Sequence, residues 1–269
     1  MKRLLLIVPA ILLISCAKQS PETLLTSGSA KDDLEDYEGA ISDYTKALEL
    51  KPDFVEAYYK RGNARKNTSN LKGALEDYNK AIEINSNYTS IYYYRGLVNS
   101  MLENYKEAVE DFTAAIKINT KNAGAYYNRS YAFGKLNNRQ AEIEDSTKSM
   151  QLYPDLKDAY NNRGIAKDDR KDLMGAILDY TKAIELDSTD AEPYYNRGIV
   201  RDELKDYKAA IEDYTRAINL DPKFSNAYYN RGLAKHSLGD SKGACADWTK
   251  VGELGDGGAY EAVKKFCNK

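Results

Sequence analysis

The chain has 269 residues, 42% of them hydrophobic, which is enough for a substantial buried core. Its formal net charge is -2, so the charge balance does not favour a general nucleic-acid-binding protein. With His236 as the only histidine, no catalytic constellation and no multi-histidine metal site is expected. We therefore expect a protein that is not an enzyme and that needs no cofactor and no metal.

Residues 1–15 have the composition of a targeting leader. Lys2 and Arg3 precede an apolar run from Leu4 to Ile14, which is too short to span a bilayer and has the layout of a secretory signal peptide. The leader ends in Leu-Ile-Ser-Cys at residues 13–16, which resembles the lipobox of bacterial lipoproteins. In that family the cysteine becomes the lipidated first residue of the mature protein, so the resemblance implies a lipid on Cys16.

The lipoprotein resemblance implies an address as well as an anchor. Residues 16–20 would form the lipidated cysteine and a short tether, and several acyl chains give stable attachment to a membrane. An aspartate after the cysteine often marks inner-membrane retention in this family, and Ala17 stands there instead, which favours the outer membrane. The periplasmic and surface faces both remain open. The alternative is an ordinary cleaved signal peptide with an incidental cysteine.

A period of 34 residues follows the tether without a gap. Position 8 of each unit is small, position 20 is alanine and position 24 is aromatic in all units but the fourth. Within each unit the apolar residues recur at helical spacing, and the small residues allow two antiparallel helices to approach closely. The seven units are residues 21–54, 55–88, 89–122, 123–156, 157–190, 191–224 and 225–258.

This pattern resembles the tetratricopeptide repeat (TPR) family across residues 21–258. The resemblance implies an all-α solenoid in which seven helix-turn-helix repeats stack into a right-handed superhelix. The remaining residues, 259–269, contain one more amphipathic segment from Ala259 to Phe266. We interpret it as a helix that caps the last repeat, because the end of a stack needs a polar outer face.

The fourth unit departs from the pattern on both of its expected helices. Ser130, Arg139, Glu142, Ser146 and Ser149 replace residues that are small, apolar or aromatic in the other units. A locally weaker repeat is the favoured interpretation, since repeat arrays tolerate such variation. The alternative hypothesis is a hinge or a partner contact on the second helix of this unit.

An arginine at position 7 and an aspartate at position 23 recur together. A charge at the seam between two helices needs a partner, so we predict Arg–Asp pairs, either within a unit or between one arginine and the preceding unit's aspartate. The alternative is that the arginines bind anions in a groove. The arginines are Arg61, Arg95, Arg129, Arg163, Arg197 and Arg231, and the aspartates are Asp43, Asp77, Asp111, Asp145, Asp179, Asp213 and Asp247.

The TPR resemblance also implies a concave partner-binding groove lined by the first helix of each unit. Position 5 would supply Tyr59, Tyr93, Tyr127, Asn161, Tyr195 and Tyr229, and position 9 would supply Leu97, Tyr131, Ile165, Ile199 and Leu233. Tyrosine offers a large contact area at low entropic cost, which suits recognition of a peptide or helix. Packing between repeats is an equally open interpretation of these rings.

Acidic residues gather at positions 12 and 13 of the fifth and sixth units, where Asp168, Asp169, Asp202 and Glu203 would face the groove. They would favour a basic partner segment. A solvated charged face is the commoner explanation of such a cluster.

Two cysteines remain, one in the last unit and one at the end of the chain. Cys245 replaces an aliphatic residue at position 21, so it is expected to be buried, and Cys267 ends the capping segment. In an oxidising compartment they could form a disulfide that fastens the cap. The alternative is two free thiols.

These features predict a membrane-anchored, non-enzymatic scaffold of the bacterial envelope that binds a peptide or helix of a protein partner. The alternative function is a ligand-binding or peptide-binding component of an envelope sensing or uptake system. Neither nucleic acid nor metal is an expected partner.

Overall fold

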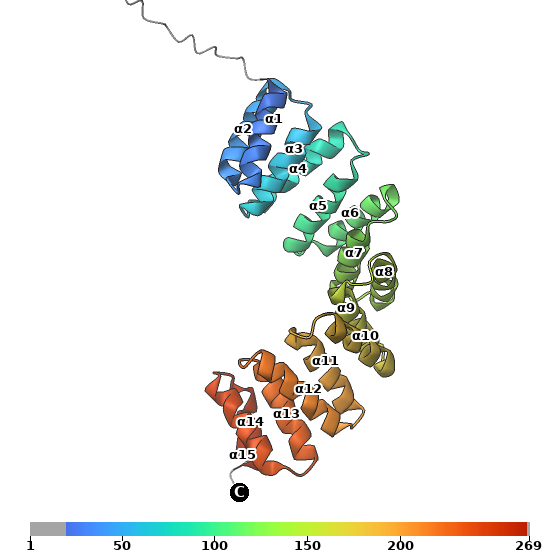
Figure 1. The fold of residues 1–269 in the computed structure, drawn as a ribbon, viewed down its shortest axis with the longest axis vertical. Helices are drawn as coiled ribbons and strands as arrows, with labels where there is room; N and C mark the ends of the chain where they lie inside the picture. The colour runs from blue at the N-terminus through green and yellow to red at the C-terminus, as the bar shows by residue number, and fades with distance from the viewer. Residues whose placement is uncertain (1–19, 268–269) are drawn as a thin grey trace, which may run out of the picture. The chain divides into compact units, whose positions relative to one another are not determined.

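The structure, a computed structural model, describes residues 20–267, which form helices joined by short turns (Figure 1). The helices come in consecutive, closely packed pairs and no strand occurs in this range, so the predicted all-α repeat fold is confirmed. The leader and the predicted lipidation site at Cys16 lie outside the described residues. Within the described range, none of the helices is both long and apolar enough to cross a membrane.

The chain divides into two compact units, Met1–Ile91 and Tyr92–Lys269. Within each, the second helix of one pair also contacts the first helix of the next, as α2 contacts α3 and α6 contacts α7. The helices are α1 Pro21–Asp33, α2 Tyr37–Leu50, α3 Val55–Asn67, α4 Leu71–Ile84, α5 Thr89–Met101, α6 Tyr105–Ile118, α7 Ala123–Lys135, α8 Arg139–Leu152, α9 Lys157–Asp169, α10 Leu173–Leu186, α11 Ala191–Glu203, α12 Tyr207–Leu220, α13 Ser225–Ser237, α14 Ser241–Glu253, a single 3₁₀ turn η1 Gly257–Ala259 and α15 Tyr260–Phe266.

Two adjacent positions define the turn inside every helix pair. Position 15 adopts a left-handed backbone in all seven units, with φ 63° at Lys205 and 86° at Gly239, which ends the first helix. Position 16 is aspartate or asparagine, and its side chain accepts a hydrogen bond from the backbone N–H three residues later in six units, as at Asp206. This N-cap starts the second helix.

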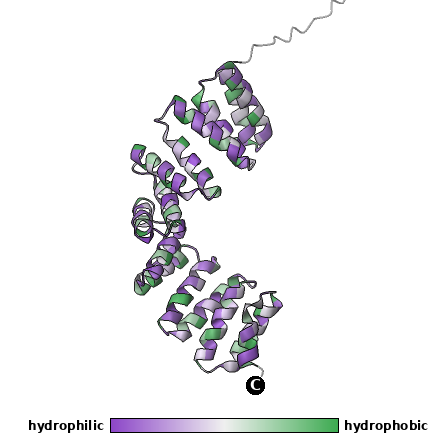
Figure 2. Cartoon of the chain, turned by 180° about the vertical axis from the view of Figure 1, so that it is seen from behind, coloured by the Kyte–Doolittle hydropathy of each residue, from purple (hydrophilic) through white to green (hydrophobic). Residues whose placement is uncertain are grey.

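The core of each pair depends on a glycine facing an aromatic ring. A Cβ atom on Gly198 would lie 2.7 Å from Cε1 of Tyr214, and equivalent glycines in five other units face their rings as closely. In the fourth unit Ser130 and Ser146 are both fully buried, so the loss of the ring accompanies the gain of a Cβ. Figure 2 shows hydrophobic and hydrophilic residues alternating along the helices, as expected when each buries one side.

Candidate functional site

Each arginine at position 7 binds the aspartate of its own unit, sixteen residues later. The aspartates are almost fully buried, and the guanidinium of Arg197, for example, lies 2.7 Å from Asp213. The within-unit form of the two predicted pairings is therefore the one that the structure has. Asp43, which has no arginine, binds Lys31 at 2.6 Å and accepts a hydrogen bond from Ser27.

The arginines also join neighbouring repeats. The second guanidinium nitrogen of Arg197 donates to the hydroxyl of Thr181 in the preceding unit at 2.9 Å, and four other arginines make the same contact with Thr45, Thr113, Thr147 and Thr215. Each guanidinium also lies over the ring of the aromatic residue at position 4. These contacts occupy the arginines as structural groups, which argues against the anion-ligand alternative.

Position 11 supplies a second donor to the same aspartate, which the sequence analysis missed. Arg201 Nη1 lies 2.8 Å from Asp213, and Arg65, Lys31, Lys167 and Lys235 act in the same way in their units. In the third unit this donor is neutral Asn99, and burial raises the pKa of its partner Asp111. The signal was available in the sequence, because threonine at position 25 and a hydrogen-bond donor at position 11 each recur in six of the seven units.

The groove tyrosines at position 5 are half-buried, and the hydroxyls of Tyr93 and Tyr195 are among those bonded to the next repeat. The hydroxyl of Tyr93 accepts from Asn128 at 3.2 Å and that of Tyr195 accepts from Asn230 at 3.1 Å. Asn161 accepts from Asn196 in the same way. These asparagines at position 6 were not predicted as functional, although they recur every 34 residues. Packing between repeats thus accounts for the hydroxyls of Tyr93 and Tyr195.

Ring contacts and burial strengthen the packing role of these tyrosines. Tyr59 lies 5.6 Å from Tyr88, and Tyr195 lies 4.6 Å from Phe224, measured between ring centroids. Burial also raises the pKa of the Tyr93, Tyr127 and Tyr195 hydroxyls.

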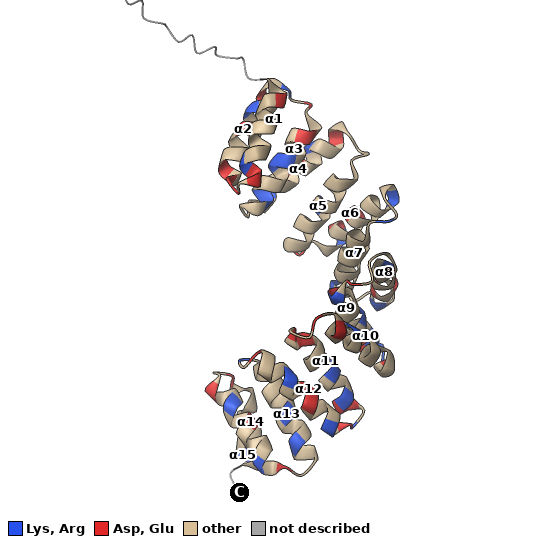
Figure 3. Cartoon of the chain, viewed as in Figure 1, with Lys and Arg blue, Asp and Glu red and all other residues tan. Residues whose placement is uncertain are grey.

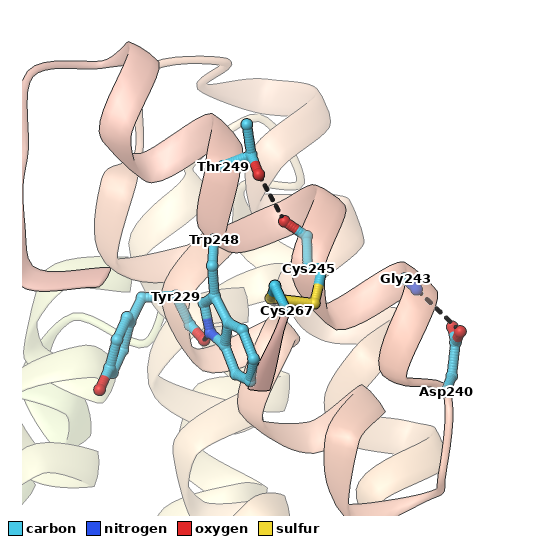
Figure 4. Close-up of a disulfide and its surroundings, with 7 residues drawn as sticks. All are labelled: Tyr229, Asp240, Gly243, Cys245, Trp248, Thr249 and Cys267. Carbon is cyan, nitrogen blue, oxygen red and sulfur yellow. Dashed lines mark hydrogen bonds between the residues drawn. A yellow bond between two sulfur atoms is a disulfide. The ribbon is translucent and has the colours of Figure 1, made fainter. Parts of the chain in front are cut away.

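Position 9 leaves more apolar surface accessible than position 5 does. Tyr131 is 39% exposed and Ile165 is 37% exposed, whereas Leu97, Ile199 and Leu233 are half-buried. Tyr229 is half-buried as well, and its ring is directed away from the disulfide in Figure 4. Tyr131 and Ile165 are therefore the predicted groove residues best placed to touch a partner.

The four acidic groove residues do not act alike. Asp169 binds Arg139 at 2.5 Å and Glu203 binds Lys171 at 2.9 Å, so both are neutralised within the chain. Asp168 and Asp202 form no ion pair with any residue between 20 and 267, and burial raises the pKa of both carboxyls. Figure 3 shows that charges of both signs are spread along the helices.

A disulfide joins Cys245 of α14 to Cys267, directly after α15, with their Cα atoms 5.6 Å apart (Figure 4). The cap also packs through Phe266, whose ring lies 5.7 Å from Trp248 and 4.4 Å from His236. Cys245 is half-buried, so the expectation of a buried residue is wrong. The aliphatic residues at position 21 of the other units are half-buried too, because this position lies one residue beyond the buried alanine at position 20.

Among the described residues, no three histidine, cysteine, aspartate or glutamate side chains are grouped so that they could hold a metal ion.

Family models built on tetratricopeptide repeats match most of the repeat region. A model described as TPR repeat matches residues 28–69, 169–201 and 203–239, and two described as tetratricopeptide repeat match residues 55–88 and 89–122. The chain belongs to the tetratricopeptide repeat family. A comparison with curated proteins found no match to it.

Several solved TPR structures are similar to this TPR protein. YrrB, described as a TPR protein with an unusual peptide-binding site, is 25% identical with a TM-score of 0.62, over 68% of this chain and 95% of that one. MamA is 27% identical with a TM-score of 0.58, over 60% and 94%. A tetratricopeptide repeat protein from Parabacteroides merdae shares the fold at 19% identity, with a TM-score of 0.67 over 93% and 100%.

The fourth tetratricopeptide repeat keeps the helix pair despite its unusual residues. Glu142, at the position of the usual alanine, is 4% exposed, and its carboxylate lies against Gly134. Arg139 compensates the buried charge at 2.9 Å and binds Asp169 of the next repeat as well. Arg139, Glu142 and Gly134 are therefore in contact: the glycine leaves room for the Glu142 carboxylate, and the arginine pairs with it. The hinge hypothesis for this repeat stays a prediction.

Replacing Glu142 with glutamine should stabilise the protein, and more so as the pH rises. Burial raises the pKa of Glu142, so in the pH window between its unfolded and folded values the folded state holds a proton that the unfolded state releases. Wild-type stability from this group therefore falls as the pH rises through the window. We expect a higher free energy of unfolding than the wild type at neutral pH, measured by urea unfolding at a series of pH values.

The matched control is Glu144→Gln, which changes an exposed carboxylate on the same helix. Its unfolding free energy should run parallel to that of the wild type. If the unfolding free energy of Glu142→Gln also ran parallel to that of the wild type across this pH range, ionisation of the buried Glu142 would not destabilise the folded protein.

Proposed function

We propose that this protein is a non-enzymatic protein-interaction scaffold, held in the bacterial envelope by a lipid on Cys16, and that it binds a peptide or helix of a partner protein. The observation that carries the proposal is the tetratricopeptide repeat fold with accessible apolar residues at a groove position, Tyr131 and Ile165. Repeats of this family generally serve as scaffolds rather than enzymes. YrrB, one of the similar structures, is described as having a peptide-binding site.

The envelope location rests on two features of the chain. The leader, with its basic start, apolar run and Leu-Ile-Ser-Cys ending, is typical of exported lipoproteins. The disulfide between Cys245 and Cys267 supports export, because such bonds form and persist in oxidising compartments and are rare in the cytosol.

The scaffold role predicts that loss of both accessible groove side chains weakens partner binding. Residues 17–269, without the lipid, would be used to capture and identify envelope proteins. Binding of the identified partner would then be measured by calorimetry. The Tyr131→Ala, Ile165→Ala double variant should weaken it at least about tenfold, since anchoring side chains contribute more than about 1 kcal/mol each.

Met174→Ala is the matched control, because Met174 is 63% exposed on a second helix, outside the predicted groove. It should bind the partner as the wild type does. Equal affinity for the wild type and the double variant would remove the groove from the proposal.

The anchor is tested separately by intact-mass analysis of the full chain and of Cys16→Ala after expression in a bacterium. The wild type should carry the added lipid mass and fractionate with membranes, and the variant should do neither. A wild type cleaved without added lipid would support the ordinary signal peptide instead.

A further inference from the structure

The junctions between repeats share one aliphatic residue that the last repeat lacks. Position 28 is Leu48, Ile82, Ile116, Met150, Ile184 and Ile218 in the first six repeats, and Gly252 in the seventh. In three of these junctions the residue at position 28 packs against the alanine at position 3 and the tyrosine at position 4 of the next repeat. Ile218, for example, clusters with Ala227 and Tyr228, and Ile116 and Leu48 do the same in their junctions.

The residues on the other side of the last junction also have small side chains. Ala262 stands where the next repeat would carry its tyrosine at position 4, and Gly258 stands where the preceding junction has Phe224. A pocket of about 390 Å³ lies next to this junction and is lined by residues of α14, of the turn after it and of α15. A Cβ atom on Gly252, which lines it, would meet no heavy atom within 4 Å, so the missing side chain leaves open space.

The pocket wall is apolar and its lining carries a single charge. Val263 contributes apolar surface, Trp248 lies behind the wall at 0% exposed, and Tyr260 is 67% exposed beside them. The carboxylate of Asp256 accepts hydrogen bonds from the backbone N–H of Gly258 and from Ser225, both at 2.8 Å. These bonds lower the pKa of Asp256, so it is ionised at neutral pH.

We propose that this pocket receives a large aliphatic or aromatic side chain of a partner protein, with a lysine or arginine of the same segment beside Asp256. The occupant is of the same chemical kind as the isoleucine and tyrosine that fill the internal junctions, so the partner completes in trans a contact that the chain makes within itself. The negative rim complements the basic neighbour. The inference rests on the proposed scaffold function but uses none of the predicted groove residues.

Trp248 makes occupancy measurable, because it is the only tryptophan of the chain and it lines the pocket. The soluble chain would be titrated with N-acetyl-phenylalaninamide and N-acetyl-leucinamide while only the indole is excited. N-acetyl-alaninamide is the matched probe that is too small to fill the space. We expect a saturable change in indole emission with the two large probes only.

Two substitutions of Gly252 distinguish the effect of filling the pocket from the effect of replacing the glycine. Gly252→Ile restores the residue type of the other repeats and should weaken binding of the large probes at least tenfold. Gly252→Ala leaves most of the volume open and should bind as the wild type does. Both variants should keep the wild-type helical circular dichroism, since a Cβ at this residue meets no neighbour. No saturable response in the wild type, or an equal response in Gly252→Ile, overturns the proposal.

A displayed random-peptide library, selected on the wild type and counter-selected on Gly252→Ile, tests the partner chemistry. Enrichment of large apolar residues next to lysine or arginine, with the basic preference lost in Asp256→Asn, supports the proposal. Probe amides that bind when no peptide does would make this a small-molecule pocket and overturn it. Peptides that ignore Gly252→Ile but fail on the Tyr131→Ala, Ile165→Ala variant would overturn this inference and leave the scaffold function standing.

Discussion

Replacing Asp213 with alanine should lower the free energy of unfolding by about 3 kcal/mol or more, as expected when one partner of a buried ion pair is removed. The Asp213 side chain is 4% exposed and accepts hydrogen bonds from Arg197 and Arg201. Without it, the Arg197 guanidinium, itself only 13% exposed, loses its counter-charge and both of the hydrogen bonds that it makes within its own repeat. Urea unfolding followed by helical circular dichroism measures the loss.

Two further variants distinguish the cost of an orphaned charge from the value of the pair. The Arg197→Met, Asp213→Leu double variant should recover most of the stability, because replacing a buried pair by apolar residues is often neutral. Lys208→Ala, at an exposed residue of the same helix, should change stability by less than about 0.5 kcal/mol. A loss below about 1 kcal/mol in Asp213→Ala would mean that the Arg–Asp pairs contribute little to folding.

Removing the disulfide should destabilise the capping helix by about 3 kcal/mol on the chain-entropy estimate for a bond between cysteines 22 residues apart. In a Cys245→Ala, Cys267→Ala variant the end of α15 is no longer tied to α14, and Phe266 no longer stays over Trp248. Hydrogen exchange should therefore accelerate in Tyr260–Phe266. The indole emission should shift to longer wavelength as water reaches the ring.

The effect should stay local, because each repeat contacts only its neighbours. Exchange in α11 and α12 is the internal reference, and it should match the wild type. A reductant should reproduce the change in the wild type and do nothing further to the variant. Unchanged exchange across α15 in the variant would show that packing alone holds the cap.

The repeat architecture follows from the order of the amino acids alone, because the interactions that make each helix pair recur within one 34-residue period. Gly198 and Tyr214 show this well: a missing side chain and a bulky ring at a constant offset predict a close approach of two helices, and the structure has it. The constant offset between arginine and aspartate likewise predicted pairing, since a charge at a helix seam needs a counter-charge close by.

Which side chains bond between repeats, and which stay exposed, could be seen only once the helix pairs were placed in space. The sequence left open whether each arginine pairs with the aspartate of its own repeat or with that of the preceding one, and Arg197 binds Asp213 of its own. Its bond to Thr181 across the junction was not predicted. Tyr195 and Tyr131 look equally suited to a groove, yet Tyr195 bonds to Asn230 whereas Tyr131 is 39% exposed. The glycine at residue 252 is plain in the sequence, but the pocket beside it becomes visible only once α14, the turn after it and α15 are placed together. Local periodicity specifies the helix pairs, whereas exposure and empty space depend on how separate pairs pack against one another.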